Sequence, residues 1–172
     1  MFGLKRLLCI LCLFAVAARS VAECVNIPAD QNASHQQLVE RTDTIALATA
    51  LAPQRINGDI YVIPFRVVER IKGSPPLRFE ITGLRADDSQ ANADFNRHND
   101  LKFWVYANTG NFKRTSDCNI YGYFRANRQY LVFIDKPHHP RSFELITADD
   151  DAWLAEVKKI VAESTPPLDL TQ

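Results

Sequence analysis

The sequence predicts a mainly β protein: a small antiparallel β-barrel with a short helix before it and an amphipathic helix at its C-terminal end. Three observations support this fold class. Short apolar segments suited to strands recur along the 172-residue chain, Gly, Pro and Asn turns separate them, and only two segments have helical features. A closed or partly closed barrel is favoured because it removes exposed strand edges.

The longest predicted strand covers residues 60–72, where apolar side chains alternate along one face. Pro64 within it indicates a bulge or an edge position. In residues 44–51 large apolar side chains alternate with alanine, which predicts one large and one small face. Residues 130–134 are all apolar, as in a strand covered on both faces. The other predicted strands are 77–82, 101–106, 119–124, 129–135 and 142–146, and residues 84–100 form a long polar loop.

Two helices are predicted. Ser34 and Gln37 have the spacing of a capping box, which predicts a short helix over residues 34–41. A second helix is expected over residues 149–163, because three aspartates stand at its positive end and an apolar stripe follows. The stripe comprises Trp153, Val157, Ile160 and Val161. Two prolines end this helix, and residues 166–172 are expected to be a loose tail.

The first 22 residues have the pattern of an export signal. Lys5 and Arg6 precede an apolar run over residues 7–18, and small residues lead to a cleavage site between Ala22 and Glu23. The run is shorter than the roughly 20 residues that span a bilayer. The protein is therefore expected in the periplasm or outside the cell, and not spanning a membrane.

The remaining chain forms one predicted domain over residues 23–165. Residues 23–172 have 17 basic and 20 acidic residues, since the signal contains three basic residues and no acidic one. This near-neutral balance gives no electrostatic reason to expect nucleic-acid binding. No catalytic nucleophile motif and no phosphate-binding glycine loop occur in the sequence, and no cofactor is expected.

Two cysteines remain after the signal, Cys24 and Cys118. An even pair in an exported protein is most simply one disulfide. Two free thiols with a redox or metal role are the alternative. A lipid anchor on Cys24 is disfavoured because the large acidic Glu23 precedes it, where acylation needs a small residue.

Several segments occur in the order found in a known family. They are residues 35–37 (His-Gln-Gln), 43–48 (Asp-Thr-Ile-Ala-Leu-Ala), 65–73 (Phe-Arg-Val-Val-Glu-Arg-Ile-Lys-Gly), Cys118, and 130–133 (Tyr-Leu-Val-Phe). Over residues 24–146 the chain resembles the netrin-like domain, which is shared with tissue inhibitors of metalloproteinases and with shorter bacterial exported proteins. The resemblance implies a five-stranded OB-type barrel and a disulfide tying Cys24 to Cys118.

The chain departs from the inhibitors at its start. Their first residue is a cysteine whose free amine and carbonyl chelate the protease zinc, within a Cys-x-Cys sequence. Here Glu23 precedes Cys24, and Asn26 stands where the second cysteine would be. Because Glu23 would convert the amine to an amide, inhibition by zinc chelation is not expected.

The leading functional hypothesis is an exported, non-enzymatic binding module that contacts another envelope or extracellular protein, with an inhibitor-like role included. Its contact surface is predicted to combine the 84–100 loop with the aromatic-rich residues 104–112, because the polar loop has no evident role in the barrel. The candidate surface residues are Asp94, His98, Trp104, Tyr106 and Phe112.

Two alternatives remain at this point. The first is a metal-dependent hydrolase, which requires two loops to converge. Its candidate ligands are Asp94, His98, Asp100, His138 and His139, although their spacing is looser than in most zinc sites. The second is a structural envelope protein without a discrete site.

Overall fold

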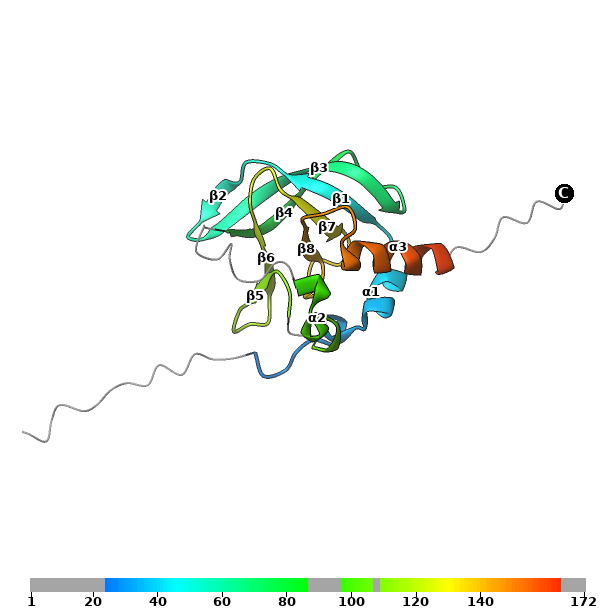
Figure 1. Ribbon diagram of the computed structural model, residues 1–172. Helices are drawn as coiled ribbons and strands as arrows, with labels where there is room; N and C mark the ends of the chain where they lie inside the picture. The colour runs from blue at the N-terminus through cyan, green and yellow to red at the C-terminus, as the bar shows by residue number, and fades with distance from the viewer. Residues whose placement is uncertain (1–23, 87–96, 107–108, 165–172) are drawn as a thin grey trace, which may run out of the picture.

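The computed structural model describes residues 24–86, 97–106 and 109–164 (Figure 1). The predicted signal over residues 1–22, Asp94 and the predicted tail lie outside these residues. The strands are β1 (Ile45–Ala50), β2 (Gln54–Asn57), β3 (Ile60–Lys72), β4 (Arg78–Arg85), β5 (Phe112–Arg114), β6 (Ile120–Phe124), β7 (Gln129–Phe133) and β8 (Phe143–Ile146). The helices are α1 (His35–Arg41), α2 (Leu101–Val105) and α3 (Ala152–Ser164), with 3-10 turns at Ala29–Asn32 and Arg97–Asn99.

The eight strands form one mixed sheet in the order β5-β6-β4-β3-β1-β7-β8, and β2 also pairs with β3. The mainly β class is therefore confirmed. The predicted small antiparallel barrel is not confirmed, because β4 and β6 pair in parallel and the sheet does not close.

A side chain spans the gap between β6 and β8. Asn111 is buried, and its Nδ2 donates to the carbonyls of Tyr123 (2.7 Å) in β6 and Phe143 (2.8 Å) in β8. The strands lie close here, since a Cβ added to Gly122 would stand 2.8 Å from the Phe143 ring. The side-chain amide of Asn111 thus joins β6 to β8 at the place where backbone hydrogen bonds between strands would close a barrel.

Two hydrophobic clusters lie on opposite faces of β1. The alternation of β1 sends Ile45 and Leu47 to one face and Ala48 and Ala50 to the other. The sheet-interior cluster comprises Ala48, Ala50, Ile63, Phe65, Ile81, Ile120, Phe124, Tyr130, Val132 and Phe143. The helix-side cluster comprises Leu38, Val39, Ile45, Leu47, Phe103, Leu131, Phe133, Ile146, Trp153, Leu154, Val157 and Ile160. Strand β7 is covered on both faces, as predicted.

The longest strand matches its prediction at both ends. Pro64 lies where the partner of β3 changes from β2 to β1. Its carbonyl accepts the N–H of Leu51, so its nitrogen faces the break between these two strands. The missing N–H therefore removes no ladder hydrogen bond.

The two predicted helices are present. In α1, Ser34 Oγ accepts the N–H of Gln37 and Gln37 Oε1 accepts the N–H of Ser34, each at 3.1 Å, which confirms the capping box. Helix α3 begins three residues after the predicted start, because Asp151 is its cap: Oδ1 accepts the N–H groups of Trp153 and Leu154.

The predicted strand over residues 101–106 is wrong. Leu101–Val105 form α2, and Asp100 Oδ1 accepts the N–H of Lys102 at 2.8 Å as the helix cap. Strands β2 and β5 were not predicted; they have four and three residues and are too short for an alternation signal. In the predicted 84–100 loop, β4 continues to Arg85 and Arg97–Asn99 form a turn.

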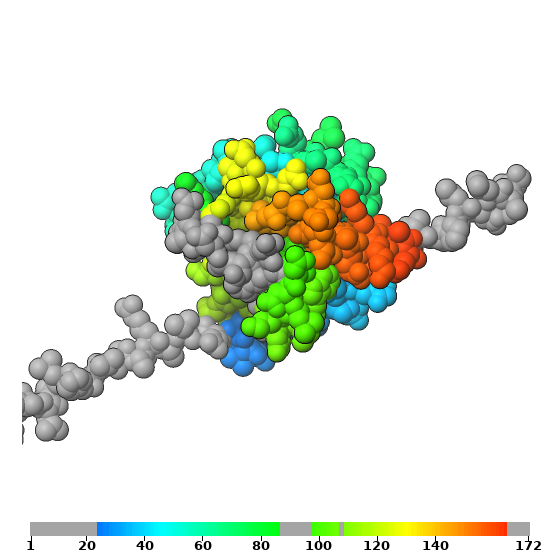
Figure 2. Space-filling model, in the orientation of Figure 1, coloured from blue at the N-terminus to red at the C-terminus, as the bar shows by residue number. Residues whose placement is uncertain are grey.

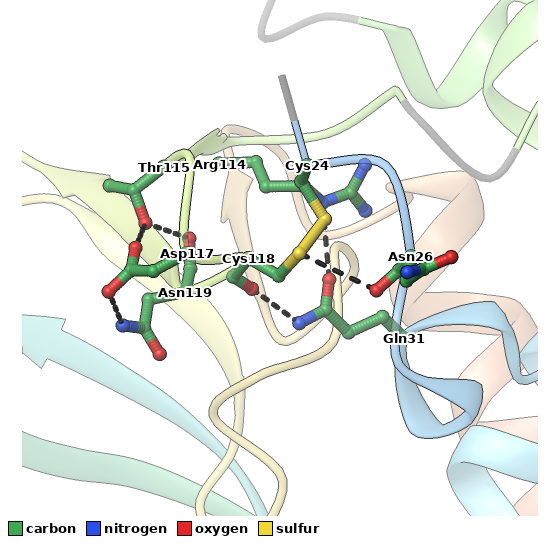
Figure 3. The surroundings of a disulfide bond; sticks show 8 residues. All are labelled: Cys24, Asn26, Gln31, Arg114, Thr115, Asp117, Cys118 and Asn119. Atoms are coloured by element: carbon green, nitrogen blue, oxygen red, sulfur yellow. Dashed lines mark hydrogen bonds between the residues drawn. A yellow bond between two sulfur atoms is a disulfide. The ribbon is translucent and has the colours of Figure 1, made fainter. Parts of the chain in front are cut away.

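The disulfide joins Cys24 to Cys118 and confirms that pairing (Figure 3). Beside it, Gln31 Nε2 donates to the Cys118 carbonyl at 2.7 Å, and Gln31 Oε1 accepts from Arg114 Nε at 3.1 Å. The N-terminal segment that leads into α1 is thereby fixed to the connection between β5 and β6.

Candidate functional site

A pocket of about 640 Å³ lies among the three helices and the connection between β7 and β8. This volume falls in the usual range for ligand sites, about 300–1,000 Å³. One wall is the first turn of α1 and the opposite walls are the end of α2 and one face of α3. In Figure 2, α2 (green) lies at the surface beside α3 (orange).

His35, the first residue of α1, lines this pocket. The rings of Phe103, Trp104 and Trp153 surround it, with centroids 5.8, 5.4 and 4.9 Å away. Its Nε2 accepts the Nε hydrogen of Arg141 at 3.3 Å. Burial, helped by the positive charge of Arg141, lowers the His35 pKa to about 4. The ring is therefore neutral at pH 7, and the bond from Arg141 assigns its proton to Nδ1.

Arg141 is the most unusual residue of the site, because it is charged and only 1% exposed. Its Nη2 donates to the carbonyls of Phe103 and Tyr106 and to Thr109 Oγ1. Its guanidinium carbon lies 3.9 Å from the centre of the Phe103 ring. Burial lowers the Arg141 pKa to about 10, opposed by the charge of Glu144. Arg141 thus fixes the end of α2 to the β7–β8 connection.

His139 completes this part of the wall. It is buried, its Nε2 donates to the Ala33 carbonyl at 3.0 Å, and its Nδ1 accepts the N–H of Arg141 at 3.0 Å. Burial lowers the His139 pKa to about 4. Neighbouring His138 is exposed and lines a smaller pocket of about 180 Å³ beside α1.

His98 forms a buried ionic group with two carboxylates. It is 4% exposed; its Nδ1 lies 2.7 Å from Asp151 Oδ2, and its Nε2 lies 3.5 Å from Glu144 Oε2. Burial alone would lower the His98 pKa, but hydrogen bonds and charge interactions with Asp151 and Glu144 raise it to about 9. His98 is therefore a cation at pH 7, with both ring nitrogens directed at carboxylates.

The predicted metal ligands do not come together in the described part of the chain. No group of three or more His, Cys, Asp or Glu side chains with metal-binding geometry occurs there. Asp100 caps α2, and the ring nitrogens of His98 and His139 are engaged in hydrogen bonds. Asp94 lies outside the described residues.

The predicted surface residues divide into three locations. Trp104 and Tyr106 line the pocket, and Trp104 Nε1 donates to the His98 carbonyl at 2.9 Å. His98 is buried and so is not part of an exposed surface. Phe112 is half-buried against the sheet-interior cluster.

Sequence reasoning missed four residues of this region: His35, Arg141, Glu144 and Asp151. Asp151 had a visible signal, since it belongs to the aspartate triplet before α3. Arg141 had none, because nothing in a Pro-Arg-Ser sequence distinguishes a buried arginine from an exposed one.

An exposed apolar face adjoins the pocket. Leu101, Val105 and Tyr106 of α2 and its cap are 75%, 64% and 59% exposed. Leu101 and Val105 are four residues apart, so they share one face of the helix. Three large apolar side chains therefore face solvent beside a concave site.

Fold and site together define a mainly β protein with a helix-lined pocket. The sequence matches no protein-family model and no curated protein. Within the described residues, every helix is too short or too polar to traverse a lipid bilayer.

Proposed function

We propose that this protein is an exported, non-enzymatic binding module that contacts another envelope or extracellular protein through the apolar face of α2 and the adjoining pocket. One observation carries the proposal: Leu101, Val105 and Tyr106 are exposed beside a pocket of about 640 Å³. Contiguous exposed apolar groups next to a concave site are typical of interaction surfaces.

The rigidity of this surface supports the proposal. Arg141 holds the carbonyls of Phe103 and Tyr106, and the Trp104 indole is fixed by its bond to His98. A preorganised surface loses little conformational entropy when a partner binds. The contacts that bury Arg141 therefore serve to present α2 in one orientation.

Export is part of the proposal. The basic and apolar pattern of residues 1–22 and the Cys24–Cys118 disulfide both support an oxidising compartment. We assign the fold to an open, netrin-like variant of the OB barrel. Zinc chelation by a terminal cysteine amine is not part of the proposed role, because Glu23 precedes Cys24.

A metal-dependent hydrolase is not proposed. It would need His98 and His139 as ligands, and their nitrogens already have hydrogen-bond partners. A general-base role for His98 at pH 7 is also disfavoured, because its pKa of about 9 keeps it protonated.

The test is affinity capture from envelope and secreted fractions with matched variants. The α2 variant is Val105→Asp with Tyr106→Ala; the control is Ile56→Asp in β2, where the side chain is similarly exposed at 58%. We expect the α2 variant to lose a protein that the wild type and the control both retain, with unchanged thermal unfolding for all three. Equal retention by both variants would contradict the proposal.

A further inference from the structure

We infer that the pocket among α1, α2 and α3 receives a lysine or arginine side chain. This inference rests on the proposed function, since the partner protein is the source of that side chain. The inference is drawn from the residues that line the pocket and from the charges that these residues carry at pH 7.

Two carboxylates and two aromatic rings line the pocket from opposite sides. Glu156 and Glu163 come from α3, seven residues apart and so on the same face of the helix, with Ile160 between them. Trp104 and Tyr106 line it from α2 and its cap. A basic side chain combines an apolar stem, which would lie against Ile160 and the indole, with a cation suited to carboxylates and aromatic faces.

The cations already at the pocket are largely engaged. The Nε and Nη2 groups of Arg141 donate to His35, to two carbonyls and to Thr109, and Glu144 opposes its charge. His35 and His139 have pKa values of about 4 and add no positive charge at pH 7. Of these three residues only Arg141 is charged at pH 7, and the Glu144 carboxylate opposes that charge.

Lys159 is the remaining cation among the residues that line the pocket. Its position beside Glu156 shows that this wall attracts a positive charge. Its ammonium lies 3.8 Å from Glu156, a long ion pair, and its side chain is 62% exposed. Exposed pairs of this kind are weak. An incoming basic side chain would replace Lys159 beside Glu156, so Lys159 acts as an internal competitor.

The test titrates the full-length oxidised protein with three blocked tripeptides, Gly-Lys-Gly, Gly-norleucine-Gly and Gly-Glu-Gly. Norleucine keeps the stem of lysine without its amine. The readout is the indole ¹H–¹⁵N signals of the two tryptophans. Trp104 lines the pocket, whereas Trp153 is fully buried. We expect Gly-Lys-Gly to shift the Trp104 signal more than the Trp153 signal, and the other two peptides to leave both nearly unchanged.

Variants sharpen the test. Glu156→Gln with Glu163→Gln should weaken Gly-Lys-Gly binding about five- to tenfold, by removing two partly exposed charge contacts. Lys159→Ala should tighten it about twofold or more by removing the competitor. Glu80→Gln, an exposed carboxylate on β4, is the control and should have no effect.

Three results would overturn the inference: equal binding of the norleucine peptide, tighter binding of the glutamate peptide, or no Trp104 shift with any peptide. The proposed function fails separately. If the Glu156/Glu163 variant still captures the partner that the α2 variant loses, the binding module stands and the basic side chain is excluded. If Gly-Lys-Gly binds as expected but no captured protein depends on α2, the pocket chemistry stands and the protein-binding proposal falls.

Discussion

The sheet-interior cluster and the helix-side cluster are built on different principles. The first is apolar apart from the Tyr130 hydroxyl, which accepts the Arg125 N–H at 2.8 Å. The second lies against a buried set of charges formed by His98, Arg141, Glu144 and Asp151. The formal charges of these two cations and two carboxylates sum to zero, and His98 contacts both carboxylates.

This difference separates the region that mainly stabilises the fold from the region that positions the walls of the pocket. The sheet interior is stabilised by the burial of apolar area and by ring packing. The hydrophobic part of this stabilisation does not depend on the orientation of the groups. Buried charges gain little net free energy, because desolvation offsets their attraction, but their hydrogen bonds fix orientation. Here they fix α2 and the start of α3, which line the pocket. The predictions below test this division.

The largest expected effect is on the sheet interior. Phe124 is fully buried, with the rings of Phe65, Tyr130 and Phe143 at 5.1, 5.1 and 5.4 Å. Phe124→Ala should lower the free energy of unfolding by about 3–5 kcal/mol, measured by urea denaturation. The Trp104 indole signal should not move.

The matched variant is Phe103→Ala in the helix-side cluster. It should cost a similar free energy, and it should also shift Trp104, because Phe103 contacts both Trp104 and Arg141. If Phe124→Ala disturbs the Trp104 signal as much as Phe103→Ala does, the two regions are not independent and the comparison fails.

The second effect is a pH dependence from His98. Its pKa is about 9 in the folded protein and about 6.5 when unfolded. Between these values the folded state holds a proton that the unfolded state releases. The stabilisation is therefore complete below pH 6.5 and is lost as the pH rises through 9, a change of about 3 kcal/mol.

His35 and His139 act in the opposite direction. Their folded pKa values of about 4 lie below 6.5, so stability falls as the pH drops from 6.5 towards 4. Urea denaturation across this range should give a maximum near pH 6.5. His98→Gln should flatten the alkaline side only; an unchanged alkaline slope in that variant would show that another group causes it.

The smallest effect tests the open edge of the sheet. Asn111→Ala removes both bonds between β6 and β8 and should cost about 2 kcal/mol. Hydrogen exchange at β6 and β8 should rise more than in β3. Asn119→Ala is the control, since Asn119 is exposed and should cost less than about 0.5 kcal/mol. Equal costs for the two variants would mean that the Asn111 link adds nothing.

Two kinds of secondary-structure element were predicted well: a long strand with many alternating apolar residues, and a short helix with a local capping signal. Strand β3 has 13 residues, so its alternation outweighs the proline within it. Helix α1 has only seven residues, but its capping box is a local chemical signal that does not depend on length.

Helix α2 was mispredicted because its pattern is ambiguous at five residues. Leu101, Phe103 and Val105 alternate as in a strand, yet only Phe103 is buried. The deciding signal was Asp100, whose carboxylate caps the helix and which was instead considered as a metal ligand. A short helix with an exposed apolar face breaks the rule that apolar residues mark the core.

The site depended on contacts far apart in the chain. His35 and Arg141 are 106 residues apart, and His98 and Asp151 are 53 apart. No local pattern encodes such pairs, so the sequence could supply Trp104 and Tyr106 as candidates but not the residues that hold them in place.

The disulfide holds one wall of the pocket in place. Cys24 anchors one end of the segment that brings Ala33 and His35 to the pocket, and the capping box fixes the other end. A chain that has not yet been oxidised would lack the first anchor, and this wall would open at a lower free energy than the sheet. Reduction of the disulfide is therefore expected to loosen this wall of the pocket before it affects the sheet.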